Sequence, residues 1–190
     1  MTKKIVLASA SPRRRELLKK LIRSFTIVPS SVDEAKITAH SPEAFVIKAA
    51  LAKAGDVALK KQNTIVIGAD TIVVLGKKIL GKPKNKKEAI NTLKKLVGKT
   101  HQVMTGLAIV ETETGQKSTG LEITKVTMKK VSDQEIKAYV DSGRPLDKAG
   151  SYGIQEIEET FIAKVDGDYE NVVGLPLQLL KRLLTPFLKS

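Results

Sequence analysis

The chain contains no cysteine, and this absence excludes a disulfide framework, a thiolate zinc site and a cysteine nucleophile. It contains only two histidines, His40 and His101, so a histidine-rich metal site is excluded as well. Any metal ion would therefore need oxygen ligands, which favours Mg²⁺ or Mn²⁺. Tryptophan is absent and aromatic residues make up 4% of the chain, so the stacking surfaces typical of single-strand nucleic-acid binders are scarce.

The chain also lacks a long apolar segment. No stretch approaches the roughly 20 apolar residues that a membrane helix requires. Near the amino terminus a short apolar run leads directly into the three arginines Arg13–Arg15, an order that does not fit a secretory signal. We therefore expect a cytoplasmic protein without a membrane partner. At 190 residues and 42% hydrophobic content, the chain can form one domain or two joined lobes.

The net charge of +13 is large for a chain of this size. Such an excess favours polyanionic partners, namely nucleic acid, nucleotides or acidic membrane surfaces. Much of the excess is lysine within helix-type segments such as KNKKEA, where the charge can also form a solvated, solubilising face. Both interpretations remain open, because charge alone does not identify the partner.

Hydrophobic periodicity predicts an α/β fold. Strand-type and helix-type segments alternate in the first half of the chain, and a β-rich stretch follows, which indicates a mixed sheet. Helices are predicted at about 12–22, 41–61, 85–97, 132–140 and 175–188, and strands at 4–8, 25–28, 64–75, 102–110, 121–131 and 161–165. Residues 147–155 are predicted as a polar, glycine-containing segment.

The turn from Ser9 to the arginines is the first candidate binding element. Arg13 and Arg14 fall in the first turn of the predicted helix, where the helix dipole disfavours positive charge by roughly 0.3–1 kcal/mol each. The arrangement is favourable if an anion binds there, held by backbone N–H groups, the hydroxyls of Ser9 and Ser11, and the guanidinium groups. The alternative is an ordinary helix cap with exposed arginines. The chain has no Walker-type phosphate loop.

Asp70 is a lone carboxylate within a run of apolar residues, and burying it is costly unless it is paired or bound to a metal. Asp33 and Glu34 follow the preceding predicted strand and could supply further oxygen ligands. Separated carboxylates at neighbouring strand ends are what a magnesium site with a bound triphosphate requires. The alternative for Asp70 is a strand-end aspartate in a turn.

Two lysines and one glutamine complete the candidate site. Lys53 interrupts the apolar face of the helix predicted from Ser41, either as a phosphate ligand or with its aliphatic stem snorkelling to solvent. Lys82 is predicted in a tight turn after the Asp70 strand, where it would neutralise phosphate charge. Gln155 could recognise a base edge with its amide, although the segment around it could also be an ordinary hairpin.

Several separated motifs in this order resemble the Maf family, also called septum-formation proteins, which are nucleoside triphosphate pyrophosphatases. The resemblance runs from Ile5 nearly to the end of the chain and is carried by LASASPRRRELL, ADTIV, LGKP, DKAGSYGIQ and NVVGLPL. Within the family the chain resembles the subgroup that acts on dTTP and UTP. Arg13, Thr71 and the SYGIQ segment carry that closer resemblance.

This resemblance implies a two-lobed fold like that of inosine triphosphatases: one domain over residues 1–190, with a long mixed sheet, flanking helices and a central cleft. It implies that Asp70 is the proton acceptor, that Glu34 and Asp70 bind a divalent cation, and that the other candidates bind the substrate or set its specificity: Ser9, Ser11, Arg13, Arg14, Lys53, Thr71, Lys82 and Gln155. A homodimer is also implied. Glu156 departs from the pattern that the resemblance implies, since the family usually has glycine after this glutamine.

Two other functional classes are alternatives to a hydrolase of dTTP and UTP. A nucleic-acid-binding protein would explain the net charge, but recognisable binding modules and interleaved aromatic residues are missing, so we expect no nucleic-acid partner. The family name also suggests a regulator of cell division, although no segment of the sequence identifies a partner surface.

Overall fold

The computed structural model describes residues 3–188. The chain forms two compact units. Unit 1 takes the described residues up to Asp70, then Thr105–Glu122 and the described residues from Gly174 onward, whereas unit 2 comprises Thr71–Met104 and Ile123–Val173. No helix among the described residues is long and apolar enough to cross a membrane. The expectation of a single domain with two lobes around one cleft stays a prediction.

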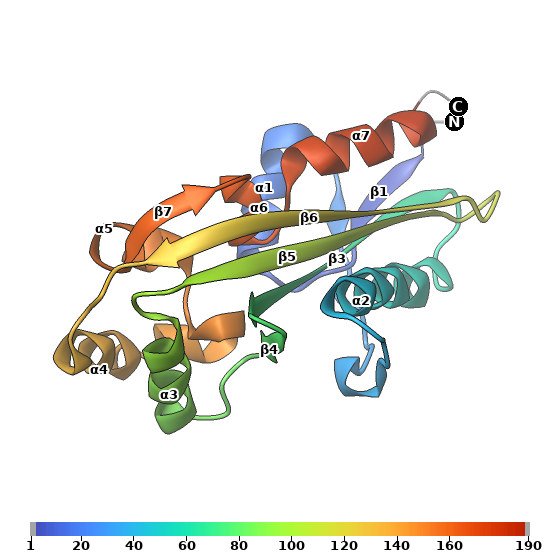
Figure 1. The fold of residues 1–190 in the computed structure, drawn as a ribbon. Coiled ribbons are helices and arrows are strands. Elements are labelled where there is room, and N and C mark those ends of the chain that lie inside the picture. The colour runs from blue at the N-terminus through green and yellow to red at the C-terminus, as the bar shows by residue number, and fades with distance from the viewer. Residues whose placement is uncertain (1–2, 189–190) are drawn as a thin grey trace. The chain divides into compact units, whose positions relative to one another are not determined.

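The strands form one mixed sheet, which confirms the α/β class with helices flanking the sheet (Figure 1). The strand order is β2-β1-β3-β5-β6-β7, and β4 pairs with β3. β1 is parallel to β2 and β3, whereas β4 is antiparallel to β3 and β7 is antiparallel to β6. The strands are β1 (Lys4–Leu7), β2 (Thr26–Ile27), β3 (Thr64–Leu75), β4 (Lys78–Leu80), β5 (Thr100–Glu111), β6 (Lys117–Met128) and β7 (Ile162–Asp166).

Unit 1 contains the helices α1 (Pro12–Leu21), α2 (Pro42–Ala58) and α7 (Leu177–Leu188) and the short 3₁₀-helix η1 (Glu34–Lys36). Both α1 and α2 start with a serine that caps the helix and a proline at the first helical position, as the sequence predicts. α1 and α7 lie next to each other (Figure 1). α2 ends at Ala58, slightly before the predicted end.

Small residues let α2 approach the sheet of unit 1 closely. A Cβ atom added to Gly68 on β3 would lie 2.3 Å from the carbonyl oxygen of Ala50, and one added to Gly106 on β5 would lie 2.4 Å from that of Val46. Both contacts are shorter than any real Cβ contact, so only glycine fits at these two positions. The buried cluster between α2 and the strands consists of Val6, Ala8, Ala50, Ala54, Val57, Val66, Ala108 and Val110.

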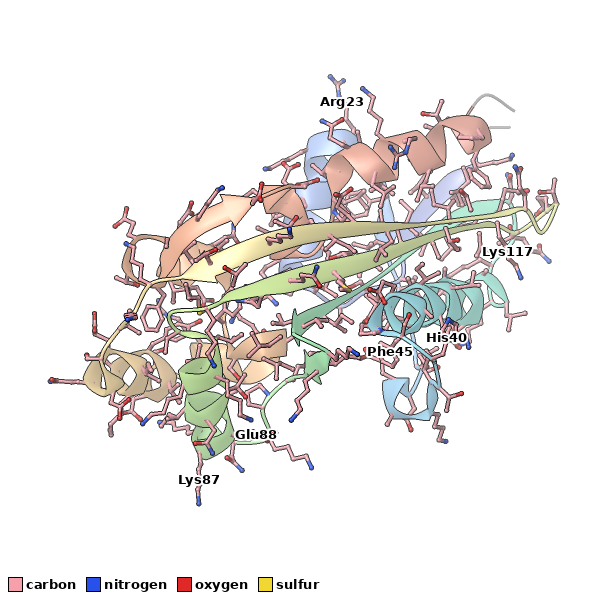
Figure 2. All side chains as sticks on the ribbon, viewed as in Figure 1. Arg23, His40, Phe45, Lys87, Glu88 and Lys117 are labelled. Atoms are coloured by element: carbon pink, nitrogen blue, oxygen red, sulfur yellow. The ribbon has the colours of Figure 1, made fainter. Side chains whose placement is uncertain are left out.

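Unit 2 contains α3 (Lys86–Leu96), α4 (Asp133–Asp141), α5 (Ile154–Phe161) and α6 (Tyr169–Val173), with the 3₁₀-helices η2 (Arg144–Asp147) and η3 (Ala149–Ser151). α3 buries one face and presents its lysines on the other. Figure 2 shows Lys87 pointing away from α3. The lysines of α3 therefore lie on a solvated face. For this helix, the solubilising interpretation of the net charge holds.

The structure differs from the sequence prediction in residues 147–155. The segment starts at the last residue of η2 and contains η3, and α5 already begins at Ile154, so Gln155 lies on a helix and not in a hairpin. α5 is a short helix without a side-chain cap, and the usual start signal was therefore missing from the sequence. Lys82 lies in an irregular segment between β4 and α3, where a tight turn was predicted.

Candidate active site

The candidate site of unit 1 lies where the parallel strands β1 and β2 end beside β3, which continues beyond them. β1 lies between β2 and β3, and its last residue, Leu7, is paired with Ile27 on one side and with Ile67 on the other. The chain leaves β1 towards β2 and later returns on the opposite side of β1 as β3, so the strand order reverses at this point. In open α/β sheets, ligands bind outside the carboxyl ends of the strands at such a reversal.

An ion-paired cluster occupies this position. The Lys53 ammonium lies 2.6 Å from Asp70 Oδ1 and 2.6 Å from Glu34 Oε1. Asp70 is 4% exposed and lies within β3, so it is not a strand-end aspartate in a turn. The Lys53 side chain is 11% exposed, which rules out the snorkelling interpretation. α2, β3 and η1 thus bring together the three residues that the sequence predicted for metal and phosphate binding.

Burial raises the pKa of Asp70 above its ordinary value, while the charge and the hydrogen bond of Lys53 lower it. Glu34 raises this pKa further and Arg14 lowers it. Asp70 Oδ2 is buried, and no described residue donates a hydrogen bond to it. A buried carboxylate oxygen without a donor is costly unless a water, a metal ion or a substrate contacts it. One buried oxygen of Asp70 is therefore available for such a contact.

The Ser9–Arg14 turn interacts electrostatically with the same carboxylates through Arg14. Arg14 Nε donates a 2.9 Å hydrogen bond to the carbonyl oxygen of Gly174, and Arg14 Nη1 donates to Ser9 Oγ at 3.3 Å. Burial lowers the pKa of Arg14, and the charges of Asp70 and Glu34 oppose that shift. These electrostatic interactions place Arg14 close to the acidic cluster.

The two serines shape the backbone of this turn. Ser9 Oγ accepts a hydrogen bond from the backbone N–H of Ser11 at 3.2 Å. Ser11 Oγ in turn accepts from the backbone N–H of Arg14 and caps α1. Arg13 follows on the first turn of α1, is half-buried, and its charge also lowers the pKa of Arg14. No acidic residue lies in this first helical turn. The structure therefore concentrates positive charge at a helix start, where an anion would be stabilised.

The carboxylates of Glu34 and Asp70 fit a divalent cation. The Lys53 ammonium already contacts one oxygen of each, and within residues 3–188 the second oxygen of Asp70 has no hydrogen-bond donor. The described residues contain no group of three or more acidic or histidine side chains that could hold a metal ion by itself. Two carboxylates are nevertheless sufficient for Mg²⁺, which usually completes its shell with waters and substrate phosphates. Asp33 instead caps η1 by accepting from the backbone N–H of Ala35.

The other predicted residues belong to unit 2. Thr71 follows Asp70 on β3 and is half-buried, whereas Lys82 and Gln155 are exposed. The backbone N–H of Gly150 donates to the carbonyl oxygen of Gly81 at 3.1 Å, so the loop before α5 contacts the segment that carries Lys82.

Glycine is required at position 150. Gly150 has a left-handed backbone with φ of 68°, and a Cβ atom there would lie 2.7 Å from Val73 on β3. The loop before α5 therefore packs directly against β3.

Sequence reasoning missed Lys148, which is 6% exposed and pairs with Asp147 and Glu156. The only feature of the sequence that could have indicated a role for Lys148 was its place in the DKAGSYGIQ motif.

Comparison with known proteins identifies the family. The family model for Maf-like proteins matches residues 4–187. The chain belongs to the Maf family. Its relatives include the dTTP/UTP pyrophosphatases of Desulforamulus reducens, 48% identical over 96% of both chains, and of Bacillus cereus, 49% identical over 97% of this chain and 96% of that protein. The Maf resemblance inferred from the five motifs is thereby confirmed.

Two solved structures share the fold of this Maf protein. The Staphylococcus aureus Ham1 protein has a TM-score of 0.56 and 16% identity, covering 97% of this chain and 100% of that one. A HAM1 protein from Coxiella burnetii has a TM-score of 0.51 and 17% identity, covering 99% and 100%. At these identities the likeness concerns the fold alone.

Proposed function

We propose that this Maf protein hydrolyses dTTP and UTP between the α and β phosphates, releasing the nucleoside monophosphate and pyrophosphate. The observation that carries the proposal is the buried cluster of Asp70, Lys53 and Glu34 at the strand-order reversal beside Arg14. Relatives of 47–49% identity over nearly their whole length, named dTTP/UTP pyrophosphatase, support the substrate class. The biological role that follows is the removal of excess or modified nucleotides before polymerases use them.

Asp70 acts as the general base in this mechanism. Its second oxygen accepts a proton from the attacking water, whose oxygen forms the new bond to phosphorus while the bond to the pyrophosphate oxygen breaks. Lys53 opposes the effect of burial and keeps Asp70 ionised, as the base must be. Arg14, Arg13 and the Ser9–Ser11 backbone orient the phosphates, and their positive charge stabilises the charge that develops on the leaving pyrophosphate.

Glu34 and Asp70 would hold Mg²⁺ or Mn²⁺. When bound, such a cation supplies Lewis-acid polarisation of phosphate oxygens. We further assign Lys82 to phosphate binding, and Thr71 and Gln155 to base selectivity, from their positions in the Maf motifs. A homodimer and a cytoplasmic location are also proposed from the family resemblance.

The proposed reaction is tested with a panel of nucleoside triphosphates in the presence of Mg²⁺ or Mn²⁺, with pyrophosphate and orthophosphate measured separately. We expect dTTP and UTP to give stoichiometric pyrophosphate at rates at least tenfold above those of purine triphosphates, and no turnover after chelation of the metal. Orthophosphate as the sole inorganic product would mean that a different bond is broken. Equal turnover with and without chelator would remove the metal from the proposal.

The raised pKa of Asp70 predicts the acid side of the pH–rate profile. The base is active only when ionised, so activity falls as the pH falls through the pKa of the folded state. Because burial raises that pKa, the acid limb of kcat/KM is expected above the ordinary aspartate value of about 3.9. A profile measured between pH 4 and 9 with saturating metal tests this expectation. An activity that stays flat down to pH 4 would contradict it.

A further inference from the structure

The first turn of α5 carries Gln155 and has an unusual cap. Gly153 is the N-cap residue of α5, and glycine has no side chain to bind the free N–H groups of the turn. The backbone N–H of Gly153 instead donates a 3.1 Å hydrogen bond to the hydroxyl oxygen of Tyr139, on α4. A side chain from another helix of unit 2 therefore fixes the start of α5.

Tyr139 is itself held by Glu156. Its hydroxyl donates a 2.7 Å hydrogen bond to Glu156 Oε2, so the same oxygen atom donates to Glu156 and accepts from Gly153. Burial, and then the hydrogen bond to Glu156, raise the pKa of Tyr139 above its ordinary value, so the hydroxyl keeps its proton. The Tyr139 ring also contacts that of Phe161, at the end of α5, with 5.8 Å between the ring centroids.

The other oxygen of Glu156 forms an ion pair with a buried lysine. Lys148 Nζ lies 3.1 Å from Glu156 Oε1 and 2.8 Å from Asp147 Oδ1, and it also donates to the carbonyl oxygen of Arg144. The Lys148 side chain is 7% exposed, so the pair is shielded from solvent on the lysine side. A Cβ atom at Gly153 would lie 2.8 Å from Lys148 Cε, so the lysine side chain packs closely against the start of α5.

We infer that Glu156 is a positioning residue that sets base selectivity by fixing the α5 turn from which Gln155 projects, through Tyr139 on one oxygen and Lys148 on the other. Successive side chains of a helix point about 100° apart. While the Glu156 side chain contacts Tyr139 and Lys148, the Gln155 side chain therefore points in another direction, and it is exposed. The inference rests on the proposed function.

Glu156→Ala and Tyr139→Phe test the inference, with Glu159→Ala as the matched control on an exposed glutamate of the same helix. We expect Glu156→Ala to raise KM for UTP about tenfold with kcat changed less than threefold. The preference for UTP over CTP, measured as the ratio of their kcat/KM values, is expected to fall about tenfold. Tyr139→Phe should behave similarly, and the double variant should lose less than the product of the single effects, because both residues act on one turn.

Three outcomes separate the possibilities. An unchanged UTP/CTP ratio in Glu156→Ala, with an active wild-type enzyme, would overturn the inference and leave the proposed function standing. A proportional loss with every triphosphate, together with a lowered Tm, would also overturn it, because Glu156 would then be purely structural. Absence of triphosphate hydrolysis by the wild-type enzyme would instead refute the proposed function. Glu156→Gln keeps the hydrogen bond to Tyr139 and is expected to restore part of the preference.

Discussion

Replacing Asp70 by asparagine is expected to lower kcat for dTTP and UTP by about 10³-fold, within the range that a general base contributes. Asparagine has nearly the same shape but cannot take a proton from water. Lys53 keeps its ion pair with Glu34 in this variant, so the buried ammonium is not left unpaired. Steady-state kinetics with pyrophosphate detection gives the size of the loss.

Stability is expected to change in a different way from activity. A carboxyl group whose pKa is raised in the folded state contributes stability at low pH, and this contribution is lost as the pH rises through that pKa. Ionised Asp70 therefore costs stability at neutral pH. Asp70→Asn should keep or raise the Tm at pH 7.5. The control Asp166→Asn, at an exposed strand end, should change neither the Tm nor kcat. Near-normal turnover by Asp70→Asn would remove Asp70 from the mechanism.

Replacing Lys53 by methionine is expected to lower kcat/KM by about 10²-fold at pH 7, the lower end of what one charge-stabilising group contributes. The change removes the cation between two carboxylates and leaves Glu34 facing Asp70. The pKa of Asp70 should then rise further, because Lys53 lowers it in the wild type. The acid limb of the pH–rate profile should move to higher pH, and alkaline buffer should restore part of the activity.

Lys48→Met is the matched control for this prediction. Lys48 lies on the same helix, is exposed, and donates to the backbone carbonyl oxygen of Thr38, not to a carboxylate of the acidic cluster. We expect wild-type kinetics and an unshifted profile from it. If Lys53→Met lost activity by the same factor at every pH, Lys53 would act on the phosphates alone and not on the ionisation of Asp70.

The sequence predicted the parts of the site that depend on short-range patterns. The apolar stripe of α2 placed Lys53 on a buried face, and the β-branched residues around Asp70 predicted a strand. The serine caps and prolines predicted where α1 and α2 begin. These signals are local, because hydrophobic periodicity and capping act within one or two turns.

The remaining features depend on contacts between distant residues. The hydrogen bond from Arg14 to Gly174 joins residues 160 positions apart, and no local pattern encodes it. The start of α5 was missed because Tyr139, and not a neighbouring side chain, receives the N–H of Gly153. Lysine is almost never fully buried unless it is paired, so the burial of Lys148 could not be anticipated without its partners.

The close approach at Gly68 limits how the enzyme can be altered. Lys53 lies on α2, and α2 packs closely against β3 because Gly68 has no side chain. Any side chain at this position would collide with the carbonyl oxygen of Ala50. Even alanine, one carbon larger, would push α2 outwards and draw the ammonium away from both carboxylates. Engineered variants that aim at new nucleotides should therefore keep glycine at position 68, because a library that randomises this position will consist largely of inactive proteins.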